Sequence, residues 1–461
     1  MTPTLRRLLV VLTIAAFALV AAACDNSSGE TTTTSGPTTT TDRSGTVGTT
    51  TTMPPLVSIP PEQIPGTHSP SIPDDVALAM RADIGVLMLV AEESRALPFL
   101  QIPTVTILDL AAFQARVAAT VEEDLDPVEI ARDQAFYELL GMLDGETDLG
   151  DILVSLYSEQ VAGFYDGDTG EIVVPAATDG FSAFQKITIV HELVHALTDQ
   201  HFDFNDEFEF LDDAGNIDEV SALLAVVEGD ATYQQLLYLE DLDPFDAADA
   251  VREMLSFDQS ALDSVPSWVA MDLSFPYDRG LAFMAAIIAD GGLKGVDEVY
   301  QDLPTTSEQI LEPRKYLRRE HPLELPRVTA TLPGWEIHQD ATMGEWGVRL
   351  ILTDTLTPGM LTQAAAGWGN DSCRVFINGD DVAMAWSYLA ESEQDAEDLV
   401  NALISHARGA MGASSSTESG GGLILEGGGT YVFIDRMDDR FVFIASTVRN
   451  AGGSLRTQMG V

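Results

Sequence analysis

The pattern of apolar positions predicts mainly helices over the first two thirds of the chain. After Pro73, apolar residues recur at helical spacing, as Val76, Met80, Ile84 and Leu87 show. This spacing predicts a helix over 73–97. Comparable patterns predict further helices over 109–123, 127–143, 183–201, 217–239 and 279–289, the last of which is closed by Gly291-Gly292.

Strand-like runs are short in this part of the chain. Residues 103–108 are predicted to form one strand. Residues 161–166 and 171–175 flank Asp166-Gly167-Asp168-Thr169-Gly170, which predicts a hairpin. The second hairpin strand precedes the helix 183–201. It is expected to be either a sheet edge that pairs with an extended substrate or an ordinary core strand.

The pattern changes after about residue 332. Strand-like runs over 374–377, 382–387, 431–435 and 441–446 alternate with a predicted helix over 393–406. Such a mixture is typical of a small α+β unit. The sequence therefore predicts an α+β protein with a predominantly helical domain over 73–331 and a smaller C-terminal α+β unit over 332–461.

The N-terminus has the features of an export signal. Arg6 and Arg7 precede an apolar run over 8–20, and small residues lead to Cys24. The cysteine after these small residues resembles the lipobox of bacterial lipoproteins. This implies a signal peptide over 1–23, and a secreted protein lipid-anchored through Cys24 to the outer face of the bacterial cell membrane. An ordinary signal peptide with an incidental cysteine is the alternative.

Residues 24–72 consist largely of Thr, Ser, Gly and Pro. A segment of this composition has little to bury and cannot offset the entropy lost on ordering. We therefore expect a disordered tether between the anchor and the folded domains.

Charge and cysteine content narrow the function. The net charge of −50 arises from 73 acidic and 23 basic residues. A nucleic-acid backbone would be repelled by this charge, so nucleic acid is excluded as a partner. Besides Cys24 the chain has only Cys373, which is expected to be a buried apolar residue rather than a nucleophile.

The strongest chemical signal is His191-Glu192-Leu193-Val194-His195, within the predicted helix 183–201. Residues four apart share one helix face, so both imidazoles can reach one metal ion. Glu192 points about a quarter turn away, where it can act as the general base on a water. The motif therefore predicts a catalytic Zn²⁺ site, and zinc lowers the pKa of a bound water to about 7.

A catalytic zinc site needs a third protein ligand. Glu228, on the next predicted helix, is the favoured candidate, and Glu219 of the same helix is a second. His201 is a third, but position 198 is Thr rather than the glycine that would turn the chain back towards the metal.

These residues resemble a known superfamily. The segment 191–200 resembles the active-site helix of the gluzincin metallopeptidases, including the thermolysin-like enzymes. Glu228-Gly229-Asp230-Ala231 resembles the Glu-Gly-x-Ala of aminopeptidase N relatives, in which the glutamate is a zinc ligand. Residues 276–280, Pro-Tyr-Asp-Arg-Gly, are similar to their Pro-Tyr-Glu-Lys-Gly. The likeness extends over 75–390 to a group of bacterial secreted gluzincin proteins.

The resemblance implies a zincin-like metallopeptidase domain. It implies that His191, His195 and Glu228 hold zinc and that Glu192 is the general base. It also implies that Tyr277 donates a hydrogen bond to the oxyanion. Asp199 and Asp230 are expected either to orient an imidazole or to be solvated surface acids.

Two departures from the family pattern matter. The gap between His195 and Glu228 is long and is filled by an acidic segment, 203–218, which is expected to be an inserted loop. The Gly-x-Met-Glu-Asn motif that anchors a free amino terminus in aminopeptidases is missing, so internal cleavage is expected.

The sequence thus predicts a surface-anchored zinc endopeptidase whose partner is a peptide or protein substrate. A gluzincin-fold lipoprotein with a binding or scaffolding role is the alternative from another class. A zinc hydrolase that acts on an ester or epoxide is a third possibility, because the water-activating chemistry is shared.

Overall fold

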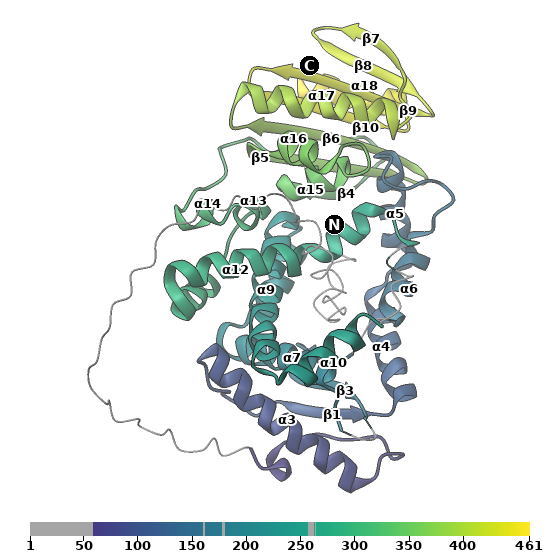
Figure 1. Cartoon of the computed structure of the whole chain (residues 1–461). Coiled ribbons are helices and arrows are strands. Elements are labelled where there is room, and N and C mark those ends of the chain that lie inside the picture. Colours follow the sequence, from purple (N-terminus) through teal and green to yellow (C-terminus); the bar gives the residue numbers. More distant parts are fainter. Residues whose placement is uncertain (1–58, 160–161, 178–179, 257–261, 263) are drawn as a thin grey trace, which may run out of the picture.

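The computed structural model describes residues 59–159, 162–177, 180–256, 262 and 264–461 (Figure 1). The predicted signal peptide, Cys24 and most of the predicted tether lie outside these residues, so the lipid anchor stays a prediction. Within the described ranges, no helix combines the length and the apolar character that a bilayer crossing requires.

The chain is an α+β protein in which helices surround a three-stranded sheet and a seven-stranded sheet forms the C-terminal part (Figure 1). In the small sheet, β1 (Thr104–Leu108) pairs in parallel with β3 (Glu171–Pro175), and β3 pairs antiparallel with β2 (Phe164–Asp166). The predicted hairpin is confirmed. Because β3 is the central strand, it has no free edge for a substrate, and the core-strand alternative is correct.

Residues 59–72 are folded against the small sheet, which corrects the predicted extent of the tether. Val105 donates its backbone N–H to the carbonyl of Pro65 (2.9 Å), beside the outer edge of β1. Ile64 and Ile72 are buried in the core below. Unlike the Thr and Ser runs before it, this segment has apolar side chains that stabilise its ordering.

Three long helices form the centre of the helical part: α7 (Ala183–Phe202), α9 (Ile217–Asp241) and α12 (Ser267–Gln301). The helices α3 (Asp74–Arg95) and α10 (Pro244–Met254) pack against α7. The predicted helices over 183–201 and 217–239 are therefore confirmed to within a few residues. Other helices of this part, among the described residues, are α4 (Leu110–Asp124), α5 (Pro127–Leu139), α6 (Leu149–Glu159), α13 (Ser307–Leu311) and α14 (Pro313–Leu317).

Two predicted elements differ from the structure. The helix expected over 279–289 begins at Ser267 instead and includes Pro276, as the first part of α12. Gly292, with φ 64° and ψ −162°, interrupts the helical geometry of α12, so the predicted closure at Gly291-Gly292 is confirmed, and a second helical stretch follows up to Gln301. The expected loop 203–218 contains a helix, described below.

That helix is α8 (Phe204–Asp213). Phe204, Phe208 and Leu211 recur at helical spacing and are buried, so they anchor one face of α8 to the core. The acidic residues between them obscure this pattern in the sequence.

The C-terminal sheet is antiparallel, with the strand order β4-β5-β6-β10-β9-β8-β7. Its strands are β4 (Glu336–Ala341), β5 (Trp368–Asn378), β6 (Asp381–Ala390), β7 (Ser415–Ser419), β8 (Gly422–Gly427), β9 (Thr430–Met437) and β10 (Arg440–Ser446). Its helices are α15 (Gly344–Leu352), α16 (Pro358–Ala365), α17 (Glu393–Gly409) and α18 (Arg449–Met459). The four predicted strands and the predicted helix over 393–406 lie within these elements.

Both faces of this sheet are covered. Neighbouring residues of a strand point to opposite faces. Phe443 packs in the cluster that includes Leu403 of α17, whereas Ile444 packs in the cluster that includes Leu455 of α18. The sheet is therefore a buried layer between helices. Cys373 of β5 is buried within it, as the sequence predicts, and burial raises the pKa of its thiol.

Candidate metal centre

The helix α7 presents both histidines of the motif to one point. It begins with a capping box, in which the Ser182 hydroxyl accepts from the Gln185 N–H and the Gln185 side chain accepts from the Ser182 N–H. From this fixed start the helix runs without interruption through His191 and His195, so their imidazoles lie on one face, one turn apart.

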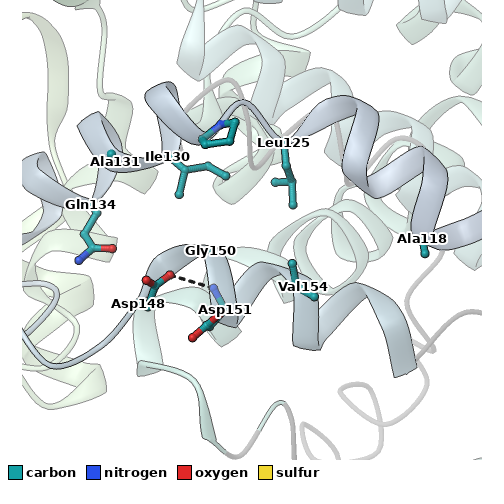
Figure 2. Close-up of a pocket in the computed structure, with 10 residues that line it drawn as sticks. Ala118, Leu125, Ile130, Ala131, Gln134, Asp148, Gly150, Asp151 and Val154 are labelled. Atoms are coloured by element: carbon teal, nitrogen blue, oxygen red, sulfur yellow. Dashed lines mark hydrogen bonds between the residues drawn. The ribbon is translucent and has the colours of Figure 1, made fainter.

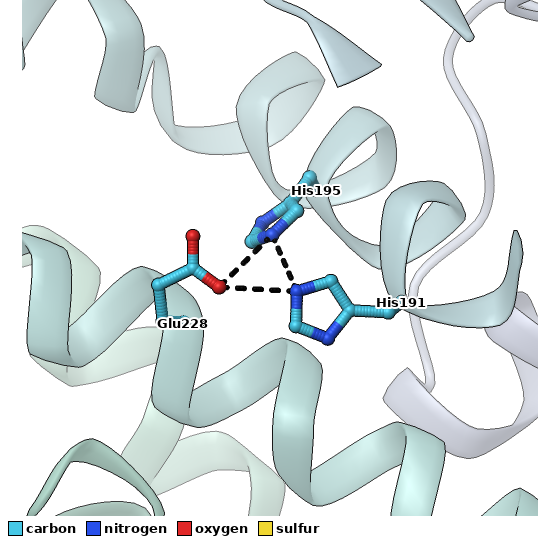
Figure 3. Close-up of side chains that lie close together, drawn as sticks. All are labelled: His191, His195 and Glu228. Atoms are coloured by element: carbon cyan, nitrogen blue, oxygen red, sulfur yellow. Dashed lines mark hydrogen bonds and ion pairs between the residues drawn. The ribbon is translucent and has the colours of Figure 1, made fainter. Parts of the chain in front are cut away.

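The helix α9 crosses α7 and brings a carboxylate to the same point (Figure 3). His191 Nε2 lies 3.0 Å from Glu228 Oε2 and 2.9 Å from His195 Nε2. His195 Nε2 lies 3.5 Å from the same carboxylate oxygen. Among the described residues, this trio is the one cluster of three or more His, Cys, Asp or Glu side chains with the geometry to hold a metal ion.

The spacing of the three atoms fits a tetrahedral zinc site. Zinc–nitrogen and zinc–oxygen bonds of about 2.0–2.1 Å place two tetrahedral ligand atoms about 3.3 Å apart. The observed separations of 2.9, 3.0 and 3.5 Å lie around this value. Two imidazoles with one carboxylate is also a donor set that catalytic zinc sites use.

The alternative third ligands lie elsewhere. Glu219, at the start of α9, accepts a hydrogen bond from the side chain of Asn216 (2.9 Å), and burial raises its pKa. His201 bonds through Nε2 to the Pro98 carbonyl (2.7 Å) near the end of α7. Neither side chain belongs to the cluster of His191, His195 and Glu228.

The electrostatics of the cluster keep its carboxylate ionised. Burial by itself raises the pKa of Glu228, but the neighbouring His195 and His191 lower that pKa to about 2. A negatively charged oxygen therefore faces two imidazole nitrogens at neutral pH, as a cation site requires.

A glutamine orients the first histidine. Gln235 of α9 accepts through Oε1 from His191 Nδ1 (3.0 Å), which leaves the Nε2 lone pair of that ring directed at the cluster. Sequence reasoning missed this residue, although it lies two turns after Glu228 and so on the same face of α9.

The two aspartates expected to orient an imidazole have other partners. Asp230 forms a buried ion pair with Arg95 (2.7 Å), and Asp199 accepts from the Tyr165 hydroxyl (2.8 Å). Neither aspartate bonds to an imidazole of the cluster. Asp230 is not a solvated surface acid either, because it is fully buried, whereas Asp199 is partly exposed.

The proposed general base is held by the edge of the small sheet. Glu192 is buried, and its Oε2 accepts from the backbone N–H of Tyr165 in β2 (2.9 Å). Glu192 is not a member of the metal-ligand cluster. Its carboxylate therefore lies outside the trio that could hold a metal, and its role as general base stays a prediction.

Tyr277 lies next to the cluster because α9 and α12 touch through glycine. Its ring centroid is 6.3 Å from that of His191. A Cβ on Gly229 would lie 2.3 Å from the backbone of Gly280, and a Cβ on Gly280 would lie 2.1 Å from the carbonyl oxygen of Ala225. These glycines follow Glu228 and Tyr277 closely in sequence, so the close crossing brings both side chains to the same place.

The centre is enclosed. The side chains of His191, Glu192, His195, Glu228 and Tyr277 belong to residues that are each at most 5% exposed. The adjoining cavity has a volume of about 10 Å³, which is room for about one water molecule.

A larger cavity of about 610 Å³ lies between α4, α5 and α6, and Figure 2 shows its mostly apolar lining. None of the residues predicted to act in catalysis or metal binding lines it. Its volume is typical of a small-molecule pocket, but its lining contains no histidine or cysteine and its carboxylates sit at solvent.

Comparison with known proteins adds little about this centre. A family model described as a domain of unknown function, DUF8575, matches residues 332–452, which contain the C-terminal sheet and most of the helices that cover it. No functionally curated protein matches the chain. A crystal structure from Chloroflexus aurantiacus, described as a candidate hydrolase with a novel fold, is similar at 17% identity and a TM-score of 0.35. The aligned region covers 54% of the present chain and 92% of the chain in that crystal structure.

Proposed function

We propose that the protein is a zinc-dependent hydrolase of the zincin-like class that cleaves peptide bonds within a chain. The observation that carries this proposal is the convergence of His191 Nε2, His195 Nε2 and Glu228 Oε2 in one buried cluster. The motif residues that the sequence singles out, Glu192 and Tyr277, lie beside it.

His191, His195 and Glu228 would hold the metal. Zinc bound there would supply a Lewis acid that makes water nucleophilic at neutral pH and polarises a carbonyl. Glu192 takes the proton of the attacking water and passes it to the leaving amine. The N–H of Tyr165 holds the carboxylate of Glu192 in place for both transfers.

Tyr277 completes the proposed machinery. Its hydroxyl donates a hydrogen bond to the oxyanion that forms when water adds to the carbonyl. The close crossing of α9 and α12 fixes this tyrosine relative to Glu228. A preset donor of this kind stabilises the transition state without reorganising during the reaction.

The test is the Glu192→Gln variant, assayed on internally quenched peptides. We expect cleavage to fall by about 10²–10⁴-fold, because a general base contributes a factor of that size. Zinc content, measured by mass spectrometry, should stay at the native level because Glu192 is outside the ligand cluster. Full activity in this variant would refute the role of Glu192 as the general base, whereas no cleavage by the zinc-loaded native protein would favour a binding or scaffolding role.

A further inference from the structure

Helix α8 covers the metal centre. Phe204 and Phe208 of α8 line the small cavity beside the cluster together with His195 and Glu228. The ring of Phe204 packs edge-on against that of His195, with 6.2 Å between their centroids. The predicted inserted loop is thus a helix whose apolar face lies directly on a metal ligand.

The residues that α9 contributes to the lining of this cavity are also mostly apolar. The apolar ones are Leu223, Leu224 and Val227, which precede Glu228 by at most five residues. A cavity of about 10 Å³ holds about one water but no amino-acid side chain. In this arrangement the cavity leaves no room for a peptide beside the cluster, since Phe204 and Phe208 line it together with the apolar residues of α9.

The form of α8 suits a movable cover. It is a ten-residue helix that directly follows Asp203, with φ 52°, and is followed, after Ala214, by Gly215, with φ 69°; both residues have the left-handed conformation. Single residues that can change φ and ψ are the usual hinges of closing segments. The outer face of α8 carries Phe210, which is 66% exposed. The apolar contacts of this helix are therefore made by the buried residues of its inner face.

We propose that α8 swings away about Asp203 and Gly215 to open the centre, and that Phe208 occupies the subsite of a substrate side chain. This inference rests on the proposed peptidase function. The wall of Leu223, Leu224 and Val227 then receives a large apolar side chain next to the bond that is cleaved. The preferred substrate is a peptide with Phe, Leu or a similar residue at that position.

The main test measures access to the metal. The zinc-loaded full chain is mixed with excess chelator, and zinc release is followed for native protein and for Phe208→Ala. We expect release to become at least about tenfold faster, because the truncation removes apolar contacts that hold α8 closed. An unchanged rate would overturn the proposal.

Two control variants distinguish a specific effect of α8 on zinc release from a general destabilisation of the fold. Phe210→Ala changes the exposed face of the same helix and should leave zinc release unchanged. Phe441→Ala removes a buried aromatic ring of the C-terminal sheet, stacked on Tyr388, and should lower the melting temperature without speeding release. If Phe441→Ala speeds release as much as Phe208→Ala, α8 is no specific cover.

A second measurement needs no metal. Hydrogen exchange of the backbone amides of 204–213 should be at least about tenfold faster than that of α7 and α9 in the native chain, because opening of α8 leaves those helices folded. Equal protection would contradict the hinge motion.

Peptide cleavage distinguishes this inference from the proposed function. With a peptidase, Phe208→Ala should raise kcat/KM, and substrates with Phe at the cleaved bond should be preferred over those with Ala. If no peptide is cleaved although Phe208→Ala speeds zinc release, the peptidase proposal fails and the cover stands. If peptides are cleaved with no effect of Phe208→Ala on cleavage or release, the cover fails and the peptidase stands.

Discussion

At the residue scale, a neutral side chain sets the tautomer of a proposed metal ligand, His191. A carboxylate, a backbone carbonyl or water commonly accepts the second N–H of a ligating histidine. Here the acceptor is the amide oxygen of Gln235, which holds the proton of His191 on Nδ1. Because an amide carries no charge, it orients the ring while adding no further negative charge beside Glu228.

This role predicts the effect of two substitutions on metal affinity. Gln235→Leu removes the acceptor, so zinc affinity should fall by about 10–100-fold, the usual effect of losing such a partner. Gln235→Glu keeps a hydrogen-bond acceptor at this position and should bind zinc at least as tightly as the native chain. Competition with a chromophoric chelator measures both. Native affinity in the leucine variant would show that Gln235 does not orient the ligand.

At the element scale, the crossing of α9 and α12 builds the site. Two helices approach this closely only where side chains are missing, and Gly229 and Gly280 meet the facing backbone directly. The motifs around Glu228 and Tyr277 therefore each contain a residue with a proposed role in the site and the glycine that positions it.

The crossing can be tested with a matched pair of glycine variants in α12. Gly280→Ala places a Cβ 2.1 Å from the Ala225 carbonyl oxygen, so the helices must separate. We expect a loss of about 1–3 kcal/mol in the free energy of unfolding, as for other overpacked cores, together with weaker zinc binding. Gly291→Ala meets no atom within 4 Å and should keep both properties. Denaturant unfolding and zinc titration compare them, and equal behaviour of the two variants would contradict the close crossing.

At the scale of the whole molecule, polar contacts join the helical part to the C-terminal sheet. Lys315 of α14 donates both to Glu308 of α13 (2.9 Å) and to Glu391, which follows β6 (2.6 Å). Burial raises the pKa of Glu308 to about 8 despite this lysine. The junction therefore contains a carboxyl group whose charge depends on pH.

The sign of the pH dependence follows from this shift. Folded Glu308 holds a proton at pH values at which the unfolded residue, with a pKa of 4.5, has lost it. The stability that the protonated Glu308 contributes is fully present below the unfolded pKa of 4.5 and is lost as the pH rises through about 8. We expect the free energy of unfolding of the native chain to decrease as the pH rises through this window. The decrease should be less steep in Glu308→Gln. Exposed Glu240→Gln serves as the control, and equal slopes for native chain and Glu308→Gln would contradict the shift.

Local patterns predicted α7, α9 and the hairpin because their periodicity lies within one element. The same reasoning failed for α8, where acidic residues between Phe204 and Phe208 resemble a solvated loop. It also failed for Gln235, whose role depends on a ring that another helix supplies. The position of Tyr277 could be expected only from a family resemblance, because the crossing at Gly280 is a tertiary contact.

The proposed function depends first on whether His191, His195 and Glu228 hold zinc. The most direct test is metal content by mass spectrometry on the full chain, for native protein, Glu228→Ala and Glu219→Ala. The site predicts about one zinc per chain in the native protein and in Glu219→Ala, and its loss in Glu228→Ala, since a catalytic zinc needs its third protein ligand. A native chain that holds no zinc even after incubation with the metal, or a Glu228→Ala variant that keeps it, would contradict the account.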